Sequence, residues 1–198
     1  MIIFAEKTLF TMTTKQLILS DYQRLKGAEM QNVSIARLAI TAIFGRIPAF
    51  TYCFWFRIAQ NCHRQPLKTI GIVMHHHYTI KYHIDIKRTT KIGPGLYLSH
   101  GMCIVINGKT EIGNNVNISQ FVNIGSNATN EYATIGNNVY IGPHVSIVGH
   151  VTIGDNVTIG AGSVVTKDIP ANATAVGVPA KVIGYDKPAR YIKNPFTA

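Results

Sequence analysis

The sequence predicts a mainly β protein, a parallel β-helix preceded by a small α-helical region. An aliphatic residue recurs at every sixth position through most of residues 92–165, glycine follows most of these aliphatics, and asparagine pairs lie between them. A period of six is neither the 3.6 of a helix nor the two-residue alternation of a half-buried strand. Gly and Asn tolerate positive φ at turns, so the pattern describes short strands joined by tight corners and stacked into a solenoid. The aliphatic positions are Ile92, Leu98, Ile104, Ile112, Ile118, Ile124, Ile135, Ile141, Ile147, Ile153, Ile159 and Val165.

The six-residue register slips twice. Eight residues separate positions 104 and 112, which predicts two extra residues near Asn107-Gly108. Eleven residues separate positions 124 and 135, which predicts a loop of five extra residues within 126–134. Loops that leave a rigid scaffold tend to carry function, so we expect this loop to form part of a site.

The chain divides into a helical region over 1–81, a β-helix over 82–184 and a polar C-terminal tail over 185–198. Apolar spacing predicts helices between residues 15 and 65, with Pro48 marking a helix start.

Residues 67–83 are expected to connect the helices to the repeats. Three consecutive histidines in this connection, His75-His76-His77, are compatible with a metal tract. Because no Cys or carboxylate is close by, a solvated or packed polar segment is the better interpretation.

Charge and cysteine content limit the function. The formal net charge is +10, but only 14% of residues are charged and no dense Lys/Arg run occurs. This argues against nucleic-acid binding and suits a phosphorylated cofactor or an anionic small substrate. Three widely spaced cysteines predict neither a disulfide framework nor a zinc site, and a reducing cytoplasm is the expected setting.

The N-terminus lacks the pattern of a secretory signal. The most apolar stretch, residues 38–56, is interrupted by Arg46 and Pro48 and is too short to span a bilayer. A peripheral membrane contact stays open, although burial of this stretch inside the protein or against a partner subunit fits better.

The end of the repeats resembles the hexapeptide-repeat acyltransferases, whose fold is a left-handed parallel β-helix. The residues that carry the resemblance are Ile159-Gly160-Ala161-Gly162-Ser163-Val164-Val165 and Ala175-Val176-Gly177-Val178-Pro179-Ala180-Lys181. Within that superfamily the chain is most similar to serine acetyltransferase and its sugar-modifying relatives, through His83-Ile84-Asp85-Ile86, Lys91-Ile92-Gly93-Pro94-Gly95 and Leu98-Ser99-His100-Gly101.

The resemblance implies acetyl transfer from acetyl-CoA to a hydroxyl. A neutral hydroxyl is a weak nucleophile, and a histidine that titrates near neutrality can take its proton as the bond forms. We expect His100 to be this general base and Asp85 to orient its imidazole, as in a catalytic triad.

His144 and His150 are the competing histidines. Together with His100 they are a candidate set for a zinc-dependent β-helix hydratase, although their spacing matches that class poorly, and we expect no metal site. The galactoside and maltose acetyltransferase branch places its base just before the long loop, and residues 117–123 contain no histidine there.

The resemblance also implies where acetyl-CoA lies, in a groove between coils of adjacent subunits. By position it implicates Gly142, Gly160 and Ala161 for the pantetheine arm. It implicates three further residues for the phosphates: Thr166, Lys167 and Lys181.

Two departures from the serine enzymes bear on the acceptor. Ser99 replaces the Asp that precedes the catalytic His, and the 126–133 loop lacks the Arg-His pair that grips a substrate carboxylate. Losing both charged contacts favours a sugar hydroxyl, with Ser99, Gln120 and Asn123 contacting the acceptor.

We therefore predict an O-acetyltransferase acting on a sugar in capsule, lipopolysaccharide or another surface glycan. Serine O-acetyltransferase of cysteine biosynthesis is the alternative, and a catalytically silent scaffold is another. The flat faces of such a β-helix predict a homotrimer.

Overall fold

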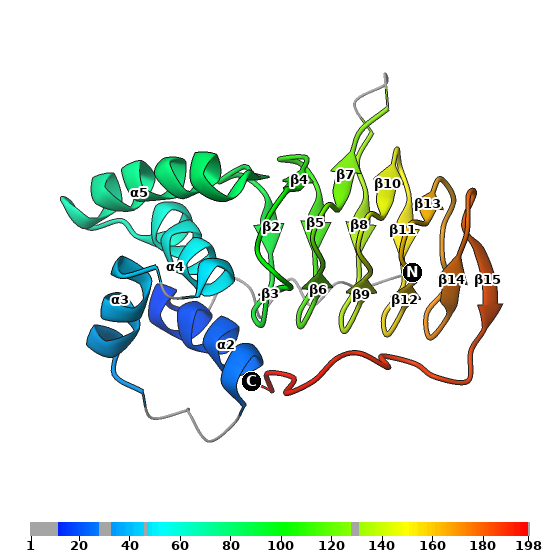
Figure 1. Ribbon diagram of the computed structural model, residues 1–198, viewed down its shortest axis with the longest axis horizontal. Coiled ribbons are helices and arrows are strands. Elements are labelled where there is room, and N and C mark those ends of the chain that lie inside the picture. Colours follow the sequence, from blue (N-terminus) through cyan, green and yellow to red (C-terminus); the bar gives the residue numbers. More distant parts are fainter. Residues whose placement is uncertain (1–11, 28–32, 46, 128–130, 198) are drawn as a thin grey trace.

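A computed structural model of the chain describes residues 12–27, 33–45, 47–127 and 131–197, and it shows helices packed on one end of a solenoid (Figure 1). The helices are α2 (Thr14–Lys26), α3 (Ile35–Ile43), α4 (Pro48–Asn61) and α5 (Leu67–Tyr82). The early strands are β1 (Ile84–Ile86), β2 (Lys91–Ile92), β3 (Tyr97–Leu98), β4 (Ile104–Ile106), β5 (Glu111–Ile112), β6 (Asn117–Ile118), β7 (Asn123–Gly125) and β8 (Thr134–Ile135). The later strands are β9 (Tyr140–Ile141), β10 (Ser146–Val148), β11 (Thr152–Ile153), β12 (Thr158–Ile159), β13 (Val164–Val165), β14 (Thr174–Val176) and β15 (Lys181–Gly184).

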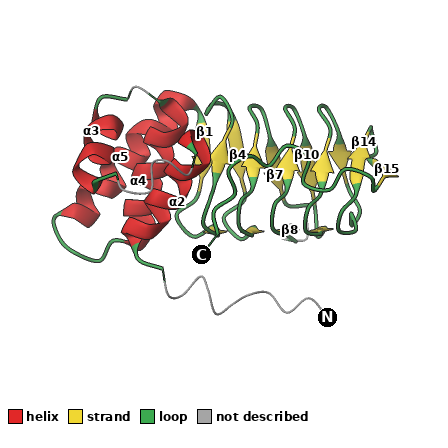
Figure 2. Ribbon diagram, turned by 90° about the horizontal axis from the view of Figure 1, so that it is seen from below, coloured by secondary structure: helices red, strands yellow, loops and turns green. Residues whose placement is uncertain are grey.

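The strands form three sheets, one on each face of the solenoid. Sheet A has the order β1-β4-β7-β10-β13, sheet B has β2-β5-β8-β11, and sheet C has β3-β6-β9-β12-β14-β15. All pairings are parallel except that of β14 with β15. Successive coils add strands in turn to sheets A, B and C, except that the last coil meets sheet B only through an isolated bridge between Ile153 and Ile169. The predicted parallel β-helix is therefore confirmed (Figure 2).

The aliphatic repeat forms the core. Ile112, Ile135 and Ile153 stack in register across sheet B and are at most 3% exposed. Each six-residue repeat points one aliphatic side chain into the core at the end of its strand. The corner that follows turns the backbone toward the next face of the solenoid. Stacked aliphatics therefore exclude water along the whole axis of the solenoid.

The first predicted register slip is wrong in its position. Ile106, and not Ile104, aligns with Ile124 of the next coil, while Ile104 pairs with Ile84 one coil earlier. β4 sends both Ile104 and Ile106 inward with Val105 exposed between them, so the series of single inward aliphatics is displaced there. The two extra residues consequently lie in the corner 99–103 and not near residues 107–108.

The second slip is where the sequence predicts it. β7 ends at Gly125, β8 begins at Thr134, and the pairing of both strands with their neighbours resumes in register. The extra residues therefore fall between β7 and β8, and 128–130 of them lie outside the described part of the chain.

Local sequence explains the helices. Thr13 and Gln16 form a capping box before α2, Ser34 caps α3, and Pro48 occupies the first turn of α4.

Within the described residues, no single helix has the length and hydropathy to cross a membrane, and α3 and α4 meet those criteria only as a pair bent by 117°.

The expected connection over 67–83 is instead largely the helix α5, because tertiary packing supplies its buried face. His75 is buried against α4, where its Nε2 lies 3.0 Å from the Tyr52 hydroxyl, whereas His76 and His77 are exposed. Burial, followed by the nearby charge of Arg88, lowers the pKa of His75 to about 4. The histidine run is thus split between a packed residue and two surface residues.

A buried ion pair joins the helices to the first coil. Arg57 on α4 donates to both carboxylate oxygens of Asp21 on α2, at 2.8 and 3.1 Å, and both side chains are at most 2% exposed. Its remaining N–H groups donate to the carbonyls of Ile92 and Gly93, and Asp21 also accepts from the Leu96 amide. Burial lowers the pKa of Arg57, and the Asp21 carboxylate more than offsets this, so the pKa rises.

The predicted C-terminal tail is not detached from the domain. Residues 185–197 return along sheet C to α2 (Figure 1). Asn117 donates to the Tyr191 carbonyl, Asn115 and Phe196 exchange two hydrogen bonds, and Arg24 of α2 binds the Lys193 carbonyl. Composition alone described this segment as polar and missed that its backbone is held by side-chain amides.

Replacing Arg57 with Met should lower the free energy of unfolding by about 3–5 kcal/mol, because it leaves the buried Asp21 carboxylate unpaired. Urea denaturation measures this. The matched control Lys187→Met removes an exposed ion pair and should change stability by less than about 0.5 kcal/mol. Equal effects of the two changes would contradict the anchoring role.

His75 should make folding sensitive to mild acid. An unfolded histidine binds a proton below about pH 6.5, whereas the folded one stays neutral until about pH 4. The unfolding free energy should therefore fall by about 2 kcal/mol from pH 7 to pH 5 and stay unaffected above pH 7. His75→Gln should remove this part of the loss while the exposed control His76→Gln retains it, as measured by denaturation at each pH.

Candidate active site

The corners between sheets C and A form a continuous ridge, here called the C–A ridge. It comprises residues 99–103, 119–122, 142–145 and 160–163 of four successive coils. Each of these corners contains a residue with positive φ: His100 (62°), Phe121 (60°), His144 (57°) and Gly162 (70°). Coils in a sheet are about 4.8 Å apart, so side chains on this ridge form a close row along the solenoid.

His100 lies in the lengthened corner of the first coil, and its side chain is exposed. The next residue, Gly101, is pressed against the start of α4. A Cβ added to Gly101 would lie 2.7 Å from the Ala49 Cα and backbone N atoms. The helical region therefore fixes the corner that carries the candidate base, since only glycine fits there.

Asp85 lies on β1, where it pairs with Val105 of β4, the strand that follows the His100 corner. Its carboxylate binds the Lys87 ammonium at 3.0 Å, and both side chains are about half exposed. In the described structure no hydrogen bond joins Asp85 to His100. Asp85 therefore lies on the strand that pairs with the segment after His100, and the contact by which it would orient the His100 imidazole stays a prediction.

Gln120, one of the predicted acceptor residues, lies at the same register position as His100 but on the next coil. The pairing of Leu98 with Ile118 places Gln120 on the coil directly after His100. Its Oε1 atom is buried and accepts no hydrogen bond from the described residues. A buried amide oxygen without a donor is costly, so a hydroxyl or amine of a bound molecule would satisfy it.

The other two predicted acceptor residues differ in position. Ser99 is partly buried at the base of the same corner, where its amide donates to the Ile118 carbonyl. Asn123 is exposed on β7, one strand position beyond the ridge.

Sequence reasoning missed an aromatic pair on the ridge. Phe121 stacks on His144 with ring centroids 4.6 Å apart and planes within 9°, and the Phe121 side chain is 45% exposed. Neither residue belongs to the hexapeptide pattern. Their contact follows only from the register, which places Phe121 and His144 at the same point of adjacent coils.

His150 lies on a different corner, between sheets A and B. It therefore does not join His100 and His144 as a hydratase-like ligand set within the chain. Among the described residues, no group of three His, Cys, Asp or Glu side chains could hold a metal ion.

The predicted acetyl-CoA residues fall into two places. Gly142 and Gly160 are stacked on the C–A ridge, and a Cβ on Gly142 would lie 2.9 Å from the Ala161 backbone N atom. Their N–H groups donate to the carbonyls of Ile159 and Ala175, so close coil packing accounts for both glycines. Ala161, by contrast, is exposed and presents a small surface beside the ridge.

The expected phosphate contacts lie at the far end of the solenoid. Thr166 and Lys167 follow β13, and all of Thr166, Lys167 and Lys181 are exposed. Ala180 donates to the Val164 carbonyl at 2.8 Å, which places Lys181 beside β13. An anion at this end would meet the exposed ammonium groups of Lys167 and Lys181.

The described residues of the predicted loop, 126–127 and 131–133, follow the end of β7 that lies away from the C–A ridge and from His100. The strand between them, β7, is three residues long, which corresponds to about 10 Å. Asn127 and Glu131 at the loop base are hydrogen-bonded to each other. The loop and the candidate base are therefore separated by the width of one sheet within a single chain.

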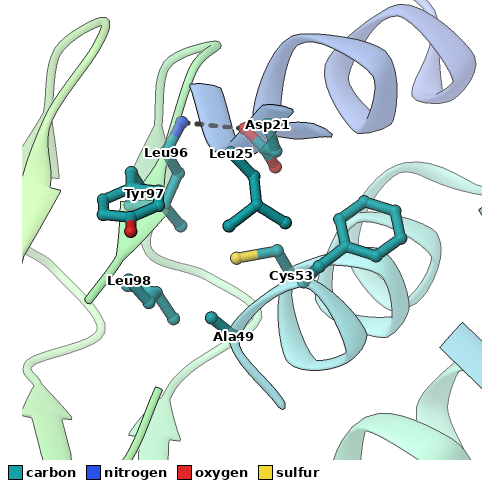
Figure 3. A pocket seen from close by; sticks show the side chains of 8 residues that line it. Asp21, Leu25, Ala49, Cys53, Leu96, Tyr97 and Leu98 are labelled. Atoms are coloured by element: carbon teal, nitrogen blue, oxygen red, sulfur yellow. Dashed lines mark hydrogen bonds between the residues drawn. The ribbon is translucent and has the colours of Figure 1, made fainter. Parts of the chain in front are cut away.

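A small pocket lies between α2, α4 and β3 (Figure 3). Its volume is about 10 Å³, which corresponds to about one water molecule. Burial raises the pKa of the Cys53 thiol that lines it, so this cysteine is not a reactive thiolate. The pocket belongs to the joint between helices and solenoid, and the exposed ridge is the better candidate for chemistry.

Residues 132–167 match the family described as bacterial transferase hexapeptide (six repeats). A serine acetyltransferase of Helicobacter pylori strain J99 is 36% identical over 135 residues, which cover 67% of this chain and 79% of that protein. This chain belongs to the serine acetyltransferase family of hexapeptide-repeat transferases. The left-handed parallel β-helix that the resemblance implies is therefore its fold.

Solved structures agree with this family assignment. Soybean serine acetyltransferase without ligand superimposes with a TM-score of 0.70 at 28% identity, covering 86% of this chain and 69% of that one. A serine acetyltransferase in complex with CoA superimposes with a TM-score of 0.68 at 26% identity, covering 86% and 69%. The chain spans about half the length of several curated relatives that it matches. The surface-glycan branch predicted from the sequence has no support from these comparisons.

Gly101→Ala should lower the free energy of unfolding by about 2–4 kcal/mol, because its Cβ collides with the α4 backbone and positive φ adds strain. Gly162→Ala is the matched control. It also has positive φ, but nothing lies within 4 Å of the added Cβ, so only about 1 kcal/mol should be lost. Chemical denaturation of both variants measures the difference, and equal losses would show that the α4 contact does not hold the corner.

Proposed function

We propose that the protein transfers an acetyl group from acetyl-CoA to the hydroxyl of a small acceptor, with His100 as general base. The observation that carries this proposal is the exposed His100 on a lengthened corner, clamped by α4, in a chain of the serine acetyltransferase family.

The chemistry needs few protein groups. The acceptor hydroxyl attacks the thioester carbonyl while the neutral His100 imidazole takes the hydroxyl proton. The tetrahedral intermediate then expels CoA as a thiolate, which receives that proton, so an acetyl ester and free CoA result. Asp85 would act by orienting the imidazole, which requires its carboxylate to exchange Lys87 for His100.

The ridge gives the donor a route. A thioester placed beside His100 can continue over Ala161 toward the solenoid end, where Lys167 and Lys181 supply positive charge for phosphates. The structure of a relative in complex with CoA supports the donor class.

L-serine is the acceptor that the relatives favour, because the similar proteins are serine acetyltransferases. This replaces the sugar as the leading acceptor. The sugar stays a second candidate through one specific observation, Ser99 in place of an acidic residue beside the base. Serine carries an ammonium group to which the neutral Ser99 hydroxyl can offer a hydrogen bond but no ion pair, whereas a sugar hydroxyl needs no opposite charge.

The separation of the loop from His100 bears on assembly. Sheet A lies between them in one chain, so a loop that contacts the acceptor would have to come from a neighbouring copy. We therefore keep the homotrimer as part of the proposal, with sites shared between subunits.

His100→Ala should lower kcat about 10²–10⁴-fold in a CoA-release assay, since it removes the base. His76→Ala, which changes an exposed histidine on α5, is the control and should leave kcat unchanged. L-serine and a panel of nucleotide sugars and oligosaccharides are compared as acceptors. Stimulation by sugars alone would transfer the proposal to the second candidate. Full activity of His100→Ala, or one tightly held zinc per chain, would overturn it.

A further inference from the structure

Helix α5 presents an apolar face that nothing in the described chain covers. The helix buries only Gly71, His75 and Tyr78. The side of the helix turned away from these residues carries three exposed aliphatic side chains: Ile70 (46% exposed), Val73 (60%) and Ile80 (61%). Together with His76, His77 and Lys81, which lie among them, they are here called the α5 outer face.

Position in the molecule makes this face accessible. α5 runs along the outer edge of the helical end, away from the solenoid tip at β15 (Figure 1). At the same end, α3 exposes three more apolar side chains: Ile40 (56%), Ile43 (56%) and Phe44 (70%). Exposed apolar residues that gather at one end of a protein mark a site of contact with another protein or a membrane.

The net positive charge of the helical region indicates what kind of partner would bind the α5 outer face. The sequence contains no Asp or Glu from Met30 to Ile84. The same stretch holds six Lys or Arg residues: Arg37, Arg46, Arg57, Arg64, Lys68 and Lys81. Arg57 is neutralised by Asp21 in the core, and Arg37, Arg64 and Lys81 are exposed.

A second copy of this chain is a poor occupant, because like charges would meet across the interface. An anionic partner with an apolar layer under its charge is complementary to both properties. A bilayer surface with anionic headgroups has this composition.

We propose that the α5 outer face docks onto an anionic membrane surface. The three aliphatics enter the headgroup–acyl boundary while the basic side chains meet the headgroups. Lys81 is suited to this position, since its ammonium already lies 5.6 Å from the ring centroids of Tyr78 and Tyr82 and can extend outward along its alkyl stem. This contact is independent of the acetyl transfer proposed above.

Vesicle flotation with the full chain tests the proposal. The protein should float with phosphatidylcholine vesicles that contain about a third phosphatidylglycerol and should stay behind with pure phosphatidylcholine. Raising salt from about 0.05 M to about 0.5 M should weaken binding severalfold, because it screens the headgroup attraction. Equal binding to both vesicle types, or none to either, overturns the proposal.

A double variant locates the contact. Val73→Ser with Ile80→Ser should reduce vesicle affinity at least about tenfold, because two aliphatics no longer enter the apolar boundary. Both positions are exposed, so folding should be retained and is checked by thermal denaturation.

The matched control is Val178→Ser with Ile183→Ser, which removes two equally exposed aliphatics (72% and 65%) near the solenoid tip. It should bind vesicles like the unaltered chain, and equal losses in the two double variants would overturn the proposal. Sedimentation of the unaltered chain without lipid is run in parallel. Self-association that Val73→Ser with Ile80→Ser abolishes would assign this face to a second copy instead.

Discussion

The close stacking of the coils is the constraint on which the rest of the structure depends. Each coil donates its amides to the carbonyls of the next, as Gly142 does to Ile159, and the corners leave no room for a Cβ at such positions. Along the whole axis, the stacked coils pair their backbone N–H and C=O groups and at the same time bury their inward aliphatic side chains. A scaffold held in this way cannot change shape locally, so variation between coils is confined to the corners.

The proposed general base accordingly lies where a corner departs from this regular stacking. The span from Leu98 to Ile106, which contains the His100 corner, is two residues longer than the matching span from Ile118 to Ile124. The same corner is the one that α4 clamps through Gly101 and Ala49. A longer turn would by itself be free to move, whereas the helix contact fixes it. The combination presents His100 to solvent on a rigid support, which is what a general base needs in order to meet a hydroxyl at a defined distance.

The sequence predicted much of this fold because the hexapeptide pattern is periodic and each position has one physical role. It failed at β4, since Ile104-Val105-Ile106 alternates and offers two inward candidates, and only pairing with Ile124 decides between them. It also missed the Phe121–His144 stack and the return of the tail to α2, because both join residues through register or through long-range side-chain contacts. The buried Arg57–Asp21 pair, 36 residues apart in sequence, was invisible for the same reason.

The helical region connects the α5 outer face with the corner that carries His100. Through Arg57 it is bonded to the carbonyls of the first coil, and through Ala49 it supports the His100 corner. α5 packs on α4 by way of His75 and Tyr52 and continues directly into β1. Only His83 separates α5 from β1, so docking the α5 outer face on a surface would hold the solenoid at a fixed orientation to that surface. The proposed catalytic corner would then stay at a constant height above the headgroups. This geometry suits an acceptor that is delivered from the membrane surface, and it does not hinder an acceptor that arrives from solution.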